Sequence, residues 1–510
     1  MNALKFLPFR YTAFGFWSQT VVLTLCITVA AVPAARADGP DETLDANVQT
    51  MMYKARSKQT GNMWDTWLYH YDGTYYLYYL ARRGGDRSWD NISMASSPDG
   101  VHWKEIGQVL SKDDDAKWMG TGSTWKSANF AKDGKFYLNY SYWKGPRQTI
   151  FFAESKDLLH WTRVGNEYEF VQDERWYKKD GRWDCIWTVP RPGGGLYGYW
   201  SATPKEETGG GFGFGQSDDG INWEALPPPK LHGVDGGEVG AIEKIGDKYY
   251  MLFCIFLSKV EFPMVTLVAD KPEGPFRRAK KNFRLLSGHT HFTRFFPSPD
   301  GVLVNHHSIS RNGRIQYAVL SGQAYFAPLK RAVIDAEGTL RLGWWQGNEK
   351  MKHRPVAVEL PGPQASEGPP AMLQNVFDAN SGIILEGKLV LPKANDERRR
   401  GLYIDCGNGD GSAVLINSEG VTEVGLMKAD GSSFKAEKII DREIAIGTPA
   451  TFRLLLKGSL MEFYLADILI ECYSLVKNAT GKIGLIGGGD AQAFKDLKAW
   501  STMCDGKRHE

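Results

Sequence analysis

The sequence lacks an excess of charge of either sign, any closely spaced pair of cysteines, and helical periodicity in the part that repeats. Lysine and arginine total 61 and aspartate and glutamate 59, so the basic surface typical of a nucleic-acid-binding protein is not expected. The six cysteines include no Cys-x-x-Cys pair and fit no zinc-site spacing. Aromatic residues, in contrast, reach 13%, which fits an all-β core or a stacking surface for flat ligands.

Long apolar runs are also scarce, and the one clear run has the pattern of an export signal. Lys5 and Arg10 give a basic start, an apolar stretch follows, and Ala35-Arg36-Ala37 resembles a cleavage site. No later stretch reaches the length of about 18 apolar residues that suggests a membrane span. We expect residues 1–37 to be a signal peptide and the mature chain to be periplasmic or secreted, without a membrane partner. An uncleaved anchor is the alternative.

Removal of the signal would leave an odd number of cysteines: Cys185, Cys254, Cys406, Cys472 and Cys504. The odd number and the irregular spacing predict buried free thiols. A disulfide among the last three is the alternative if the compartment is oxidising.

A turn signature recurs five times along the chain, at Asp72, Asp133, Gly194, Asp247 and Asp300, with intervals of 61, 61, 53 and 53 residues. A second signature follows about 25 residues later and ends in Trp103, Trp161 and Trp223. Five units of strand, turn and strand predict a five-bladed β-propeller over residues 38–357. A β-sandwich of evenly spaced hairpins is the alternative. The recurring tryptophans are expected to pack blade against blade.

The pattern changes after the repeats. Residues 358–372 are rich in proline, glycine and serine, which indicates a linker. Residues 373–510 contain short strands with period-two alternation, which predicts a second, β-sandwich domain. The fold class is therefore all-β, with a propeller followed by a sandwich.

Alignment of the blades by their turns brings chemically active residues to one level. The first strands of blades one, three, four and five then offer Asp65, Asp184, Glu238 and His291. These strands are expected to surround the propeller axis, so the side chains should converge at one mouth of the central cavity. Aromatic residues accompany them: Trp64, Trp67, Trp125, Trp183 and Trp187.

Converging carboxylates repel one another, so at least one should hold its proton near neutral pH. A protonated acid beside an ionised carboxylate is the pair that glycoside hydrolysis needs, and aromatic walls suit the faces of sugars. In the alternative interpretation these acids only form ion pairs with Arg182, Arg191 or Arg294.

Residues 50–345 resemble the five-bladed propeller enzymes of glycoside hydrolase families 43 and 32. The resemblance lies in the carboxylate separations of 119 and 54 residues and in the strands GGEVGAIEKIGDKYYMLF and GHTHFTRFFPSPDG. The C-terminal part resembles the concanavalin-like sandwich of family 32. The chain departs from that family where WDTW replaces its Asn-Asp-Pro motif.

This resemblance implies a role for each residue. Asp65 would be the base or nucleophile, Asp184 would tune pKa values and bind sugar hydroxyls, and Glu238 would be the general acid. His291 would line the cavity where some relatives hold a metal or an ordered water, and Arg294 would hold the Asp184 or Glu238 carboxylate. Substrate-binding candidates are Trp64, Trp67, Trp125, Trp183, His291 and Arg294.

We therefore expect an exported glycoside hydrolase that cleaves a furanoside, fructoside or galactan-type glycan and needs no cofactor. Two alternatives remain open. One is a catalytically silent carbohydrate-binding propeller, and the other is a transglycosylase or phosphorylase on the same fold.

Overall fold

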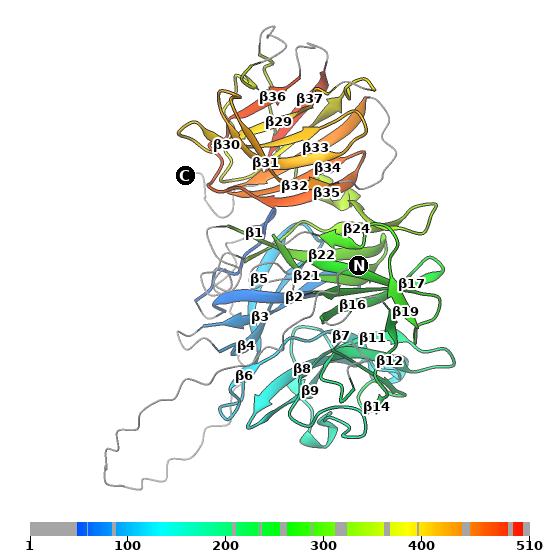
Figure 1. Ribbon diagram of the computed structural model, residues 1–510. Helices are drawn as coiled ribbons and strands as arrows, with labels where there is room; N and C mark the ends of the chain where they lie inside the picture. The colour runs from blue at the N-terminus through cyan, green and yellow to red at the C-terminus, as the bar shows by residue number, and fades with distance from the viewer. Residues whose placement is uncertain are drawn as a thin grey trace, which may run out of the picture. The chain divides into compact units, whose positions relative to one another are not determined.

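The computed structural model describes residues 48–502 apart from 59, 84–87, 207–210, 233, 235–236, 256–262, 287–288, 312–323, 362–367, 395–396, 441–448 and 488–492. The expected signal peptide and Cys504 lie outside these residues. The described part is built almost entirely of antiparallel strands, which confirms the all-β prediction (Figure 1). No helix in it is long and apolar enough to cross a membrane.

Five sheets follow one another along the first part of the chain and form the five predicted blades. Blade one contains β2 (Asn62–Tyr71), β3 (Thr74–Arg82), β4 (Asn91–Ser97) and β5 (Trp103–Ser111), with β1 (Val48–Gln49) at its edge. Blade two contains β6 (Trp118–Met119), β7 (Thr124–Lys126), β8 (Phe136–Lys144), β9 (Arg147–Ser155) and β10 (Thr162–Arg163). A short helix, α1 (Phe130–Asp133), stands between β7 and β8.

Blade three contains β11 (Trp183–Pro190), β12 (Leu196–Ala202), β13 (Phe212–Ser217) and β14 (Glu224–Leu226). Blade four contains β16 (Glu238–Ile245), β17 (Lys248–Cys254), β18 (Met264–Ala269) and β19 (Phe276–Arg278), with the short β15 (Leu231–His232) and β20 (Arg284–Leu286). Blade five contains β21 (Thr290–Ser298), β22 (Gly301–Ile309), β23 (Ala324–Phe326), β24 (Lys330–Ile334) and β25 (Leu340–Trp344). The inner strands lie beside one another, since β2 and β16 both contact β21, and β11 contacts β16.

The second repeated signature forms a turn that a carboxylate stabilises. The side chain of Asp99 accepts backbone N–H bonds from Val101 and His102, both at 3.0 Å. Asp157 and Asp219 repeat this arrangement. The tryptophan that ends each turn packs on other aromatic rings, as predicted: Trp103 on Phe326, Trp161 on Tyr78 and Trp223 on Trp125.

The remaining strands form two sheets that face each other. One sheet has the order β27 (Ala371–Met372), β36 (Ile483–Ile486), β29 (Arg400–Asp405), β30 (Asp410–Ile416), β31 (Thr422–Lys428) and β32 (Phe434–Ile440). The other has the order β35 (Ile468–Ser474), β34 (Leu460–Leu465), β33 (Ala450–Lys457), β28 (Ile383–Leu389), β37 (Phe494–Ser501) and β26 (Arg354–Val356). Apolar side chains of both sheets, such as Leu385, Leu402 and Leu454, form one core, so this part is a β-sandwich.

Blade five and the sandwich are joined within a single sheet. Strand β25 of the blade pairs with β35 of the sandwich through Gly343 and Ile468. A β carbon on Gly343 would come within 2.8 Å of the Val333 side chain in β24 of the same blade, and 3.7 Å from the Asp467 carbonyl oxygen of the sandwich. A strand of the sandwich, β26, also ends before residue 358, where the linker was predicted to begin.

A fully buried polar cluster lies at this junction. Lys330 of blade five donates a hydrogen bond to the Glu462 carboxylate of the sandwich, and neither side chain is exposed. The Tyr464 hydroxyl donates to the same carboxylate at 2.8 Å. His306 lies 3.8 Å from it, and burial together with the Lys330 charge lowers the pKa of His306 well below its ordinary value. His306 is therefore neutral, and the lysine–glutamate pair supplies the charge compensation.

The cysteines of the described residues are buried free thiols, as predicted: Cys185, Cys254, Cys406 and Cys472. A disulfide between Cys406 and Cys472 is excluded, because they lie in different cores. A pairing with Cys504 lies outside the described residues.

Glu462→Gln is expected to lower the free energy of unfolding by about 3–5 kcal/mol, because it leaves the Lys330 ammonium buried without its counter-charge. The double variant Lys330→Met/Glu462→Leu should recover most of that loss. Urea unfolding followed by tryptophan fluorescence measures both. Lys388→Met is the control, because it removes the exposed pair with Asp496 and should change stability by less than about 1 kcal/mol. Equal effects of the buried and exposed changes would contradict a role for the junction cluster.

Candidate functional site

The inner strands of four blades each contain a β-bulge close to their start. The irregularities fall between Trp64 and Thr66 in β2, Asp184 and Trp187 in β11, Val239 and Ala241 in β16, and His291 and Arg294 in β21. In three of them a residue other than glycine has a positive φ: Asp65 at 42°, Cys185 at 58° and Phe292 at 44°. Bulges re-aim side chains and are common next to active sites. Aspartate is among the residues that tolerate this backbone region best, which explains an aspartate within a strand.

Asp65 is buried and carries an unsatisfied carboxyl oxygen. The residue is 8% exposed, and Oδ1 has no hydrogen-bond partner among the described residues. Burial raises the pKa of Asp65 to about 8; the Arg294 charge opposes this rise, the Asp184 charge adds to it, and Arg182 opposes it. At neutral pH the ligand-free protein therefore holds a proton on Asp65.

Asp184 is fixed by a short chain of polar side chains. The Ser141 hydroxyl donates to Asp184 Oδ1 at 2.6 Å, and Gln148 Nε2 donates to that hydroxyl at 2.8 Å. A β carbon on Gly120 would lie 2.5 Å from Asp184 Oδ1, so only glycine leaves room for the carboxylate. Asp184 is thus held in one position, with 4% of the residue exposed.

Arg182 joins two of the three carboxylates. Its Nη2 donates to Glu238 Oε1 and lies 3.4 Å from Asp184 Oδ2. The guanidinium therefore offsets the repulsion between acids that come from different blades. Strand alternation puts residues two apart on the same face, so the position of Arg182 two residues before Asp184 was the signal that could have marked it as a site residue.

Arg294 is buried close to the candidate site. It is fully buried, donates to the carbonyl of Gly240, and lies 3.9 Å from Cys185 Sγ. Its guanidinium also lies over the ring of Trp187, 5.6 Å from the centroid. Arg182 donates to both the Asp184 and the Glu238 carboxylates, and the charge of Arg294 acts on Asp65. The expectation that Arg294 holds the Asp184 or Glu238 carboxylate stays a prediction.

His291 and Trp64 lie together beside Asp65. The two rings are 5.3 Å apart, and Trp64 also stacks on His307 at 5.0 Å. His291 Nδ1 is 3.6 Å from Cys254 Sγ. These aromatic groups form one wall next to the carboxylates.

The other three tryptophans assigned to substrate binding lie in packed cores instead. Trp67 is fully buried on Tyr78. Trp125 donates to the carbonyl of Gly220, and Trp183 is fully buried among Phe170, Tyr177 and Trp200. Their positions in the predicted axial strands therefore do not bring these three rings into the site.

A group that could hold a metal ion lies away from the carboxylates. Ligand atoms of His306, Glu462 and Cys472 lie within 4.8 Å of one another. The Lys330 ammonium already pairs with Glu462 there, so these residues do not fit a cation well. The metal or ordered water expected near His291 stays a prediction.

Comparison with solved structures finds the same fold in enzymes that act on sugars. One is a β-fructofuranosidase of glycoside hydrolase family 32 from Bombyx mori, with a TM-score of 0.67, 13% identity, and coverage of 90% of this chain and 94% of that one. Another is fructan 1-exohydrolase IIa from Cichorium intybus, with a TM-score of 0.62, 14% identity, and coverage of 89% and 97%. A third is an exo-inulinase from Aspergillus awamori, with a TM-score of 0.62, 12% identity, and coverage of 92% and 99%.

No family model and no curated protein matches the sequence. At these identities the likeness shows a shared fold, a propeller followed by a sandwich, over nearly the whole length of both chains.

Asp65→Asn is expected to stabilise the protein increasingly as pH rises from about 4 to 8. The folded pKa of about 8 lies above the ordinary value of 3.8, so the folded state binds this proton more tightly and stability is lost as pH rises through that window. Asparagine cannot ionise, so it removes this loss of folding free energy, which is at most about 1.4 kcal/mol per pH unit. Denaturant unfolding at pH 4, 6 and 8 measures it. The exposed turn variant Asp247→Asn should show no such trend, and a constant gap between Asp65→Asn and wild type would contradict the raised pKa.

Proposed function

We propose that this protein is an exported glycoside hydrolase and that Asp65, Asp184 and Glu238 carry out the cleavage. The observation that carries the proposal is the convergence of three buried acids from three blades, one of which holds a proton at neutral pH. The fold shared with family 32 enzymes supports it.

The proposed roles follow the resemblance found in the sequence. Asp65 attacks the anomeric carbon or activates a water, Glu238 protonates the leaving oxygen, and Asp184 binds sugar hydroxyls and offsets charge. In the ligand-free protein the proton resides on Asp65, and Glu238 pairs with Arg182. For this assignment the proton must move to Glu238 when substrate enters, and Arg182, whose side chain is 38% exposed, must release that carboxylate.

The first substrates to test are β-fructosides, because the similar structures are named for fructofuranosidase, fructan exohydrolase and inulinase activities. Other furanosides and galactans are the next candidates, since WDTW replaces the family-32 motif around the first acid.

Variants of the two reacting acids are expected to differ in their dependence on the leaving group. Glu238→Gln should slow cleavage of a natural oligosaccharide by roughly 10²–10⁴-fold and slow an activated aryl glycoside much less, because an activated leaving group needs no proton. Asp65→Asn should slow both substrates alike. Initial rates of sugar or phenol release measure this.

If Asp65→Asn, and not Glu238→Gln, slowed the aryl glycoside much less than the oligosaccharide, Asp65 would be the acid and Glu238 the base or nucleophile. If the wild-type protein bound oligosaccharides and cleaved none of the candidate glycans, it would be a silent binding propeller and the hydrolase proposal would be wrong. Product analysis separates hydrolysis from transglycosylation and, with added phosphate, from phosphorolysis.

The pH profile of kcat/KM gives an independent test, because it reports groups of the free enzyme. The proton that Asp65 holds in the free enzyme is the one that must move to Glu238, so kcat/KM should fall as pH rises through an apparent pKa near 8. A rise through the same value to a plateau would mean that cleavage does not need this proton and would contradict its transfer to Glu238. A profile without any transition between pH 7 and 9 would contradict the participation of Asp65.

A further inference from the structure

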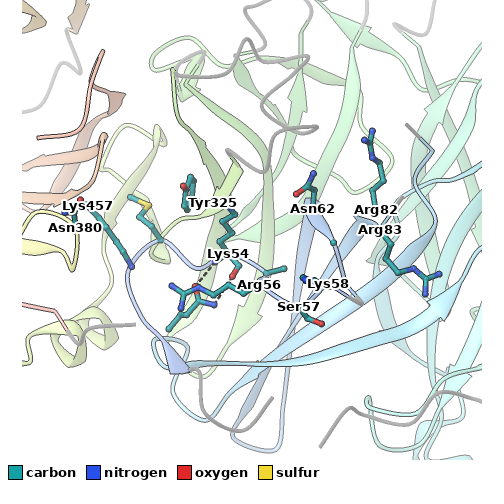
Figure 2. Close-up of a pocket in the computed structure, with 14 residues that line it drawn as sticks. Lys54, Arg56, Ser57, Lys58, Asn62, Arg82, Arg83, Tyr325, Asn380 and Lys457 are labelled. Carbon is teal, nitrogen blue, oxygen red and sulfur yellow. Dashed lines mark hydrogen bonds between the residues drawn. The ribbon is translucent and has the colours of Figure 1, made fainter. Parts of the chain in front are cut away.

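A strongly cationic pocket of about 820 Å³ lies at the edge of blade one (Figure 2). It is lined by Gln49, Met52, Lys54, Ala55, Arg56, Ser57, Lys58, Gly61, Asn62, Arg82, Arg83, Tyr325, Asn380 and Lys457. Six of these described lining residues are lysine or arginine, and none is aspartate or glutamate. Because the whole chain is nearly neutral, this local excess of positive charge is not a general property of the surface.

Arg82 is the buried member of this group. The residue is 8% exposed, and its Nε and Nη1 have no hydrogen-bond partner among the described residues. A buried polar group without a partner costs free energy, and a buried charge costs more. Such a group, placed in the wall of a pocket, indicates that a ligand provides the missing acceptors.

The other cations add to the positive potential. Lys54 lies over the ring of Tyr325 at 5.4 Å, and burial and the charge of Arg56 lower its pKa. The Glu105 carboxylate, beside the pocket, accepts the backbone N–H groups of Arg56 and Ser57, and Arg83 lies 3.7 Å from Asp90. The lysines and arginines nevertheless outnumber these two acids. An incoming anion would therefore relieve repulsion among like charges.

The pocket is joined directly to the candidate site by strand β2. Asn62, in the pocket wall, begins this strand and pairs with Arg82 at the end of β3. Asp65 follows three residues later, or about 10 Å along an extended strand. The sandwich contributes Asn380 and Lys457 to the opposite wall. A glycan of several units that passes over Asp65 can reach these cations.

We propose that this pocket binds anionic substituents, sulfate esters or carboxylates, of the glycan that the enzyme cleaves. Arginine presents paired N–H groups that match both kinds of oxyanion, and such charge-assisted hydrogen bonds are stronger than neutral ones. The role of the pocket rests on the glycan-cleaving function proposed above, and it makes the natural substrate an acidic polysaccharide.

Calorimetric titration of the full chain with defined oligosaccharides tests the pocket. Asp65→Asn prevents cleavage during the measurement, and sulfated galactan oligosaccharides, oligogalacturonides and neutral inulin oligosaccharides are the probes. At least one acidic probe should bind more tightly than the neutral one, and Arg82→Met in this background should weaken it by roughly tenfold or more. Lys132→Gln, in the exposed helix α1, is the control and should have no effect.

The two acidic probes identify the substituent. A preference for the sulfated probe indicates sulfate esters, and a preference for the oligogalacturonide indicates carboxylates. Equal affinity of all three probes, or acidic binding that Arg82→Met leaves unchanged, would overturn the role of the pocket. If acidic oligosaccharides bind through Arg82 but wild type cleaves no glycan, the pocket stands and the hydrolase proposal fails. If the protein cleaves neutral glycans but does not bind acidic ones, the hydrolase proposal stands and the role of the pocket fails.

Stability gives a readout that a purely structural arginine would not share. Because Arg82 is buried without acceptors, Arg82→Met should unfold at the same or a higher temperature than the parent protein, although it loses acidic-glycan binding. A saturating acidic oligosaccharide should raise the melting temperature of the Asp65→Asn chain and leave that of the chain with both changes where it was. A large loss of stability in Arg82→Met would show that the arginine supports the fold and would overturn its assignment to a ligand.

Discussion

Buried charge must be compensated, and this constraint governs the carboxylate site, the domain junction and the cationic pocket alike. At the site, Arg182 offsets Asp184 and Glu238, while Asp65 is compensated by a proton and by the nearby charge of Arg294. At the junction, Lys330 and Glu462 compensate each other completely. At Arg82, no described residue accepts a hydrogen bond from the buried nitrogens Nε and Nη1. The three places differ in how fully the chain itself compensates the buried charge. Compensation is incomplete at the proposed catalytic site and at the proposed anion pocket.

The backbone makes this crowding possible. An ordinary strand directs successive side chains to opposite faces, so it can present few neighbouring groups to the axis. The bulges near the starts of β2, β11, β16 and β21 break this alternation and turn the chain locally. As a result, Asp65 lies within its bulge while Asp184 and His291 stand immediately before theirs. Acids from different blades thereby meet although their positions in the strands differ by a residue.

Much of this architecture could be predicted from the sequence, because it depends on residues that are close together in the chain. Turn residues at intervals of 61 and 53 predicted the blades, and their alignment selected the three acids. Features that depend on contacts between residues far apart in the chain could not be predicted. Trp67, Trp125 and Trp183 were assigned to the site because they lie in the predicted axial strands, but their rings are buried in packed cores. Arg182 was considered only as a generic ion-pair partner, because the arginine that reaches an acid of another blade depends on how the blades are spaced.

The pairing of Gly343 with Ile468 has a consequence for how this protein can change over evolutionary time. Propeller and sandwich share hydrogen bonds within one sheet, such as that from the Trp344 N–H to the Asp467 carbonyl at 2.8 Å. The sandwich therefore cannot be exchanged for another accessory module by recombination at residues 358–372 without exposing a strand edge of the last blade. We therefore expect the propeller and the sandwich to be retained together in evolution, and specificity to change through substitutions within this pair of domains.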